Sequence, residues 1–258
     1  MNPTAVITLS EAGAQKAIRL VKALGAADLF VHKMVPAQYG GRRFGTVQTL
    51  THRIFHRYKN LVYILPTGVV VRSIDGLLKG KLVDPAVVVV DVGARYAISL
   101  LSGHEGGANR LALQVGNILA AEPVITTTTD AEKDLIVGIG CRRGAAADDI
   151  VAAIGLALKK VKADVSRVRL LATADIKHNE AGLLEAAELL GIGLRLVASE
   201  EIRSTAKQFK HTPLAARKVG LPAVSEPAAL LAGRRTRLIL GKTIIRHVTV
   251  AIALENCL

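Results

Sequence analysis

The sequence is poor in cysteine and aromatic residues and contains no long apolar segment. Its 258 residues include two cysteines, Cys141 and Cys257, which are too few for a disulfide framework and are typical of a reducing cytoplasm. The apolar runs, such as residues 86–90, are far shorter than the roughly 20 residues that a membrane-spanning helix needs. The first ten residues show no features of a secretory signal. We therefore expect a cytoplasmic protein without a membrane partner.

Acidic residues are in the minority. The chain has 34 Lys and Arg residues against 21 Asp and Glu residues, which gives a formal net charge of +13. Such a surplus indicates a polyanionic partner, which a nucleic acid, an anionic membrane or a carboxylate-rich substrate would each provide. The basic residues are dispersed, however, so a generally basic surface explains them equally well. The chain has no fitting motif for nucleic-acid binding, and we expect no nucleic-acid partner.

The abundant residues are Val, Ile, Leu, Ala and Gly, which are typical of α/β folds with buried parallel strands. Strand and helix patterns alternate along the chain. In the N-terminal half we expect strands at 5–9, 28–35, 61–66, 86–91, 96–100 and 123–127, and helices at 10–25, 46–58, 68–80 and 107–120. In the C-terminal half we expect strands at 135–140, 169–173, 194–198 and 248–254, and helices at 148–161, 180–191, 199–210 and 226–233. This alternation predicts two α/β domains in series, residues 1–133 and 134–258, each a mainly parallel sheet flanked by helices.

The sharpest motif is the turn SGHEGGAN at residues 102–109, between a predicted strand and a predicted helix. His104 suits general acid or base chemistry, and the amide of Asn109 can donate and accept hydrogen bonds. A zinc motif of the form H-E-x-x-H would need histidine at position 108, where this chain has alanine, so we expect no metal site. The alternative is a tight structural turn whose histidine caps the local backbone.

Several strand ends carry further candidates for ligand binding. In the turn at residues 102–109, the adjacent Gly106 and Gly107 allow a close backbone approach. They leave N–H groups at the start of the helix predicted at 107–120, where an anion is favoured. Ligands of open α/β sheets lie at the carboxyl ends of strands, so we expect the turns at residues 66–72 and 102–109 to contribute to one site. The alternatives are helix capping by Thr67 with a solvated Arg72, and a simple polar loop at residues 126–134. The substrate-binding candidates in this half are Ser102, Gly106, Gly107, Thr67, Gly68, Arg72, Thr128 and Asp130.

The C-terminal half contains GIGCRRG at residues 138–144, which invites comparison with a dinucleotide fingerprint. Its spacing is G-x-G-x-x-x-G and the expected acidic residue is missing, so we expect no nicotinamide cofactor. Arg142 lies beside a predicted helix start and suits an anion, whereas Cys141 has either a lowered pKa or a packing role. Lys177 either contacts the substrate or forms a buried salt bridge with Glu180, and Glu226, which precedes Pro227, has the same two interpretations. By contrast, an aspartate before Pro85, Asp84, indicates a structural turn.

Taken together, residues 61–131, with LLSGHEGGAN and PVITTTTD, closely resemble the N-terminal region of the CbiG family, the cobalt-precorrin-5A hydrolases of anaerobic cobalamin synthesis. The segments LIVGIGCRRG, LATADIKHNEAGLLEAAELLG and VGLPAVSEPAALLAG resemble the C-terminal domain of that family, which also exists as the stand-alone protein CobE. Two departures matter. The family commonly has a middle segment between the two regions, which this chain lacks, and Leu214 stands where the C-terminal domain usually shows serine.

The resemblance implies an activity: opening of the δ-lactone on ring A of cobalt-precorrin-5A and release of acetaldehyde to give cobalt-precorrin-5B. The cobalt would be carried by the substrate, so no separate cofactor is implied. A corrinoid rich in carboxylates fits the positive charge of the chain. Within this reading, His104 is a hypothetical base and the region of Gly106, Gly107 and Asn109 would hold the oxyanion. The alternative is a non-catalytic corrinoid-binding or carrier protein of the same pathway. A homodimer and an association with other enzymes of the pathway stay open.

Overall fold

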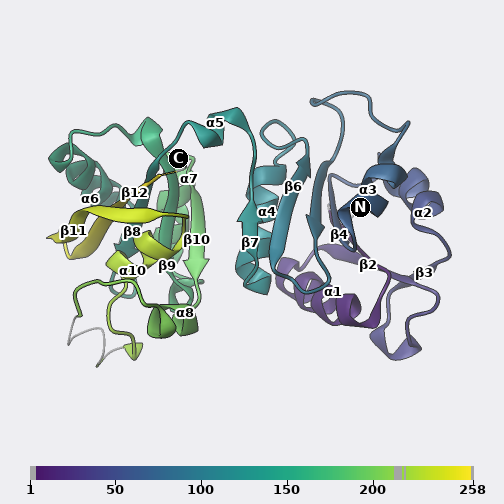
Figure 1. The fold of residues 1–258 in the computed structure, drawn as a ribbon, viewed down its shortest axis with the longest axis horizontal. Helices are drawn as coiled ribbons and strands as arrows, with labels where there is room; N and C mark the ends of the chain where they lie inside the picture. Colours follow the sequence, from purple (N-terminus) through teal and green to yellow (C-terminus); the bar gives the residue numbers. More distant parts are fainter. Residues whose placement is uncertain (1–3, 212–216, 218, 257–258) are drawn as a thin grey trace. The chain divides into compact units, whose positions relative to one another are not determined.

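A computed structural model describes residues 4–211, 217 and 219–256 (Figure 1). The chain divides into two compact units, Met1–Thr127 (unit 1) and Thr128–Leu258 (unit 2). The sequence prediction placed this division after residue 133. Both units are α/β folds in which helices flank a sheet, as the alternation of patterns predicts. No helix in the described part of the chain is long and apolar enough to span a membrane.

Unit 1 contains a seven-stranded sheet in the order β3-β2-β1-β4-β5-β6-β7. The strands β3, β2, β1, β4 and β5 run parallel to one another. Strand β6 pairs antiparallel with β5, and β7 runs parallel to β6. The C-terminal ends of β6 and β7 therefore lie at the same end of the sheet as the N-terminal ends of β4 and β5. The strands are β1 (Thr4–Thr8), β2 (Ala27–His32), β3 (Arg42–Phe44), β4 (Asn60–Ile64), β5 (Ala86–Val90), β6 (Tyr96–Leu101) and β7 (Glu122–Val124).

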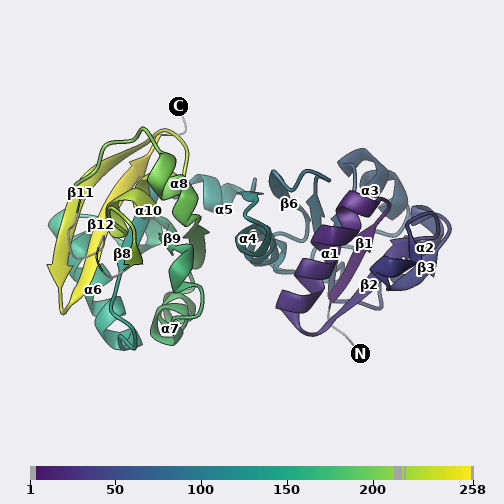
Figure 2. The same cartoon turned by 90° about the horizontal axis from the view of Figure 1, so that it is seen from below.

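Four helices cover the two faces of this sheet: α1 (Glu11–Leu24), α2 (Val47–Ile54), α3 (Thr67–Ile74) and α4 (Ala108–Leu119). Helices α1 and α4 pack on one face, and α2 and α3 pack on the other. Figure 2 shows α1 along β1. Because both faces are covered, the interior strand β5 is apolar and buried along its whole length. The side chain of Ser10 caps α1 by accepting a hydrogen bond from the Gly13 N–H at 3.1 Å, as expected for this residue type.

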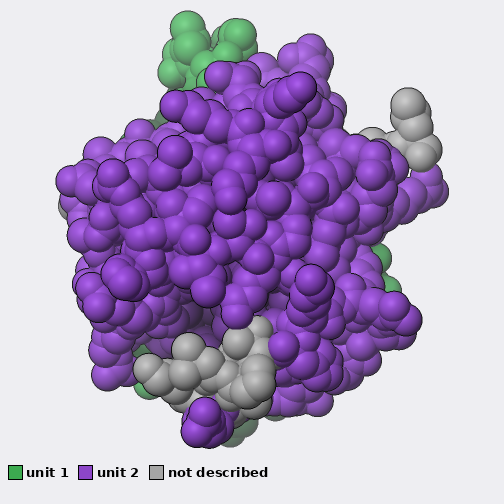
Figure 3. All heavy atoms as spheres, turned by 90° about the vertical axis from the view of Figure 1, so that its left-hand side faces the viewer, with its two compact units in different colours: residues 1–127 green, residues 128–258 purple. Residues whose placement is uncertain are grey.

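Unit 2 contains a five-stranded sheet in the order β10-β9-β8-β12-β11. The strands β8, β9 and β10 are parallel, and β12 and β11 add an antiparallel hairpin at one side. Figure 3 shows one face of unit 2 in purple. The strands are β8 (Leu135–Gly140), β9 (Val168–Ala174), β10 (Gly193–Val197), β11 (Thr236–Ile245) and β12 (Val248–Glu255).

The helices of unit 2 again lie on both faces of the sheet. Helices α6 (Ala147–Lys160) and α7 (Ala181–Leu190) pack on one face, and α10 (Ser225–Leu231) packs on the other. Gly138 of β8 lets α10 come close, because a Cβ at this position would overlap the carbonyl of Ser225. The short helices are α5 (Thr128–Ala131), η2 (Val165–Arg167), η3 (Asp175–Lys177) and α8 (Ser199–Ser204).

Three of the differences between the structure and the sequence prediction affect whole elements or long segments. The expected loop at 36–45 contains the short helix η1 (Ala37–Tyr39) and the edge strand β3. Strand β11 is absent from the sequence prediction, and its pairing with β12 contains register shifts between Leu238 and Thr243. The helix expected at 199–210 ends at Ser204, after which Thr205 adopts an extended backbone.

Candidate functional site

The residues Ser102–Gly107, called the glycine turn below, connect β6 to α4 and reverse the chain within six residues. Ser102 and Gly107 both adopt positive φ, at 57° and 86°, and a Cβ at Gly106 would overlap the Ser102 side chain. The Ala108 N–H donates to the Ser102 carbonyl at 3.1 Å. The adjacent glycines are therefore required by this turn, one for its close approach and one for its backbone conformation.

Asn109 fastens the glycine turn to the rest of this end of the sheet. Its backbone N–H donates to the Gly103 carbonyl at 2.9 Å. Its side-chain Oδ1 accepts from Ser99 Oγ at 2.8 Å, and its Nδ2 donates to Thr127 Oγ1 at 3.0 Å. One amide thus joins β6, the first turn of α4 and the segment that follows β7. Of the polar loop predicted at residues 126–134, this network places Thr127 next to the glycine turn.

The glycine turn leaves backbone donors at the start of α4. In the described part of the chain, the N–H groups of Gly106 and Gly107 have no protein acceptor. They precede a helix of 12 residues, whose N-terminal end favours negative charge. His104 is exposed on the same turn, and its ring does not cap the backbone there. The turn therefore presents two amide donors and one imidazole.

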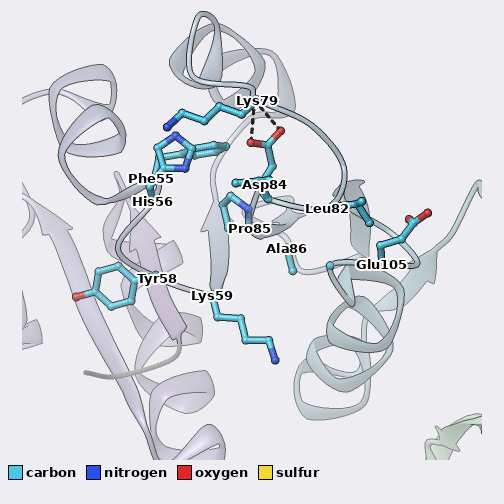
Figure 4. Close-up of a pocket in the computed structure, with 12 residues that line it drawn as sticks. Phe55, His56, Tyr58, Lys59, Lys79, Leu82, Asp84, Pro85, Ala86 and Glu105 are labelled. Atoms are coloured by element: carbon cyan, nitrogen blue, oxygen red, sulfur yellow. Dashed lines mark hydrogen bonds between the residues drawn. The ribbon is translucent and has the colours of Figure 1, made fainter.

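A cavity of about 370 Å³ adjoins the glycine turn (Figure 4). Three segments line it: the connection between α2 and β4, the loop between α3 and β5, and the glycine turn. They meet because β6 ends where β4 and β5 begin. Glu105 and Gly106 contribute from the turn, whereas His104 does not line the cavity.

The cavity is lined by more free basic than free acidic groups. His56, Lys59 and Lys79 line it, and neither lysine ammonium has an ion-pair partner among the residues that the structure describes. The carboxylate of Asp84 is instead occupied, because it accepts from the N–H groups of Lys79 at 2.9 Å and Gly80 at 3.0 Å. This confirms the structural role expected for the aspartate before Pro85.

The second acidic group of the cavity, Glu105, is paired. Lys81 Nζ lies 2.9 Å from Glu105 Oε1. This hydrogen bond lowers the pKa of Glu105 and raises the pKa of Lys81. A second bond joins the same two loops, from Ser102 Oγ to the Asp84 carbonyl at 3.1 Å. Ser102, the first residue of the glycine turn, is thus buried and holds the turn against the neighbouring loop.

The opposite end of the unit 1 strands holds Thr67, Gly68 and Arg72. They follow the end of β4, whereas the glycine turn lies beside the beginning of β4 and β5. The expectation that these two turns share a site is therefore wrong, because β6 is antiparallel to β5. The capping alternative for Thr67 also fails, since no side chain caps α3. Arg72 Nη1 donates to the Gly68 carbonyl at 3.2 Å within its own helix.

The remaining candidates lie in unit 2. Thr128 and Asp130 belong to α5, and Arg142 is exposed in the loop between β8 and α6. Lys177 Nζ lies 3.0 Å from Glu180 Oε2, so the structure contains the salt bridge between these two residues. Burial raises the pKa of Glu180, but hydrogen bonds from Gly144 and Lys177 outweigh it and lower the pKa overall.

Two further side chains of unit 2 have structural surroundings. The buried carboxylate of Glu226 accepts from the N–H groups of Lys210 at 2.7 Å and Lys242 at 2.6 Å, so both of its oxygens hold backbone. Burial raises the pKa of Cys141, which packs against the unit 2 core. The packing role is thus confirmed for Cys141, and the lowered pKa is not. Leu214 and Cys257 lie outside the described residues.

Sequence reasoning missed the basic cavity. Lys59 and Lys79 lie on loops without a motif, and the folded chain alone brings them beside the glycine turn. The one available signal was the structural reading of Asp84, whose carboxylate shapes the loop that carries Lys79. Within the described ranges, no group of three or more His, Cys, Asp or Glu residues is arranged to hold a metal ion.

Comparison with known families places both units. The family model described as "Cobalamin synthesis G N-terminal" matches residues 49–130, and the one described as "Cobalamin synthesis G C-terminus" matches residues 135–253. The chain belongs to the CbiG family. The CbiG models cover the glycine turn, the cavity loops and nearly all of unit 2.

Three curated relatives of the chain are named as cobalt-precorrin-5A hydrolases, one of them as a probable one. A cobalt-precorrin-5A hydrolase of Priestia megaterium is 27% identical over 314 aligned positions, covering 81% of this chain and 82% of the relative. This alignment is longer than the chain itself, so the relative contains insertions that this chain lacks. A cobalt-precorrin-5A hydrolase of Salmonella typhimurium is 44% identical over 89 residues, 34% of this chain and 25% of the relative. The crystal structure of CobE, a protein from the cobalamin biosynthetic pathway, is 28% identical with a TM-score of 0.45, covering 47% of this chain and 90% of CobE.

Proposed function

We propose that this chain is a cobalt-precorrin-5A hydrolase that opens the ring A δ-lactone and releases acetaldehyde to give cobalt-precorrin-5B. The observation that carries the proposal is the match of both CbiG models in one chain, together with the curated hydrolase that aligns over 81% of it. The substrate supplies its own cobalt, so the proposal includes no resident cofactor. We place the reaction in the cytoplasm, because two cysteines in 258 residues fit a reducing compartment.

The glycine turn supports the chemistry of lactone opening. Attack of water on the lactone carbonyl needs a base to accept a proton and donors to stabilise the developing oxyanion. We assign the donors to the N–H groups of Gly106 and Gly107, which point to no protein acceptor in the described residues and precede α4. His104, exposed between them and the end of β6, is the proposed base.

Asn109 has a positioning role in this proposal. Its side-chain amide bonds both Ser99 and Thr127, so it holds the turn in place instead of facing the substrate. Hydrogen bonds of this kind fix catalytic groups to within the tolerance that a reaction needs. In unit 2, the exposed Arg142 stays a predicted contact for a carboxylate of the substrate.

The test is an assay of the purified full chain with cobalt-precorrin-5A. Acetaldehyde is followed by its reduction with alcohol dehydrogenase and NADH, and the corrinoid product is identified by mass. The proposal predicts one acetaldehyde for each cobalt-precorrin-5B formed. Tight binding of the substrate without acetaldehyde would instead favour the carrier alternative, and the absence of both would contradict the family-based assignment.

A further inference from the structure

The loop between α3 and β5 exposes an unusual amount of apolar surface. Residues 78–83 of this loop include three large apolar side chains. Leu78 is 52% exposed, Leu82 is 80% exposed and Val83 is 66% exposed. Single exposed apolar residues are common, but several of them on one loop make that loop a candidate for ligand binding. Leu82 and Val83 also line the 370 Å³ cavity, so this apolar surface continues into it.

Basic side chains accompany the apolar ones. Lys79 belongs to the same loop and extends toward His56, and Lys59 lines the cavity from the connection between α2 and β4 (Figure 4). Both ammonium groups lack an ion-pair partner within the ranges that the structure describes. Among the described residues neither nearby acid forms an ion pair with them, because the Asp84 carboxylate accepts from backbone N–H groups and Glu105 is paired with Lys81. The surface therefore combines an apolar patch with two available cations.

The loop is held in this shape before any ligand arrives. The Asp84 carboxylate binds the backbone of Lys79 and Gly80, and the Asp84 carbonyl accepts from Ser102 Oγ. The Lys81–Glu105 pair adds a second link to the glycine turn. A surface that is already ordered loses less conformational entropy when it binds, which favours affinity.

We propose that this surface, made of Leu82, Val83, Lys59 and Lys79, binds the edge of the macrocyclic substrate. Leu82 and Val83 contact the apolar face of the ring, and the two lysines bind carboxylates at its periphery. The cavity volume is at the low end of ligand pockets, which hold about 300–1,000 Å³, so it takes one edge of a large ring. This inference rests on the proposed function, whose glycine turn lies at the same end of the sheet.

The test compares two stable corrinoids that differ at their periphery. Cobyrinic acid has carboxylate side chains, and cobinamide has amides on the same ring. Their binding to the full chain is measured by the change in the corrinoid absorption spectrum, for wild type and for Lys59→Gln/Lys79→Gln. We expect the double variant to weaken cobyrinic acid binding about tenfold or more, and cobinamide binding less than about twofold. Leu82→Ser should weaken both ligands by about three- to tenfold.

Two matched variants provide the controls. Lys159→Gln/Lys160→Gln removes the same charge from the exposed end of α6, and Leu189→Ser alters a side chain of α7 that is 63% exposed. Neither should change the binding of cobyrinic acid. The inference is overturned if wild type binds no cobyrinic acid, if the lysine variant binds it as wild type does, or if the control pair weakens it equally. Lysine-dependent binding in a chain that releases no acetaldehyde would uphold this inference while the proposed activity fails.

Discussion

The two ends of the central strands of the unit 1 sheet, one with Gly68 and one with the glycine turn, look alike in sequence and differ in structure. Each has a glycine near the start of a helix, Gly68 at one end and Gly106 at the other. At Gly68 an added Cβ would have only the flexible Arg72 side chain nearby, at 3.5 Å, whereas at Gly106 it would overlap Ser102. The glycine turn also adjoins the basic cavity. A glycine beside the start of a helix is therefore required only where the folded chain leaves no room for a Cβ atom.

The largest expected effect comes from the proposed base. We expect His104→Ala to lower kcat for acetaldehyde release by about 10²- to 10⁴-fold, because proton transfer by a side chain contributes this much. His52, an exposed histidine of α2 in the same unit, supplies the control, and His52→Ala should leave kcat within about twofold. Equal activity of wild type and His104→Ala would reject the assignment of the base and leave the family membership intact.

The next largest effect is expected from the substitution of Gly106, compared with that of Gly68. We expect Gly106→Ala to lower the free energy of unfolding of unit 1 by about 1–3 kcal/mol through overpacking against Ser102. Gly68→Ala should stay within about 0.5 kcal/mol of wild type, since its Cβ has room and alanine favours a helix.

Tyrosine fluorescence during urea unfolding measures this difference. All four tyrosines lie in unit 1 and the chain has no tryptophan, so the signal reports this unit alone. If the two alanine variants unfolded at the same urea concentration, the two ends would be equally constrained and the comparison would fail.

Asn109 tests the network that holds the glycine turn. Asn109→Ala removes hydrogen bonds to Ser99 and Thr127, and we expect a loss of about 1–2 kcal/mol in the free energy of unfolding of unit 1. Arg72→Ala at the other end removes one exposed bond within α3 and should cost about 0.5 kcal/mol or less. Because Asn109 positions the turn, its variant should also lower kcat more than it raises KM. An increase in KM alone would indicate direct substrate binding by Asn109.

The smallest effect concerns pH. The pKa of Glu105 is lowered below its usual value of 4.5 by Lys81, so the pair stabilises the folded state above that pH and loses its contribution as the pH falls through the lowered pKa. Both groups are exposed, so we expect a small difference between wild type and Glu105→Gln at pH 7 that shrinks toward pH 3 and in high salt. The same difference should be absent in a Lys81→Gln background. A difference that grew in acid would contradict this pairing.

Much of the fold could be predicted from local patterns. The run AVVVV at residues 86–90 indicates a strand covered on both faces, and Ser10 indicates the start of α1. The candidate site could be predicted only in part. The glycine turn has its own signature in SGHEGGAN, but the direction of β6 depends on its pairing with β5, which no local pattern specifies. For the same reason Lys59 and Lys79, far apart in sequence, could not be assigned to one cavity before the fold was known.

The most direct test of where the substrate binds removes the same charge from each end of the unit 1 strands. Lys59→Gln/Lys79→Gln alters the end with the glycine turn, and Lys33→Gln/Arg72→Gln alters the exposed side chains of the opposite end. The measurement is kcat/KM for acetaldehyde release from cobalt-precorrin-5A. We expect a loss of about tenfold or more, mainly through KM, for the first pair and less than about twofold for the second. A greater loss from Lys33→Gln/Arg72→Gln, or equal losses from both pairs, would contradict this expectation.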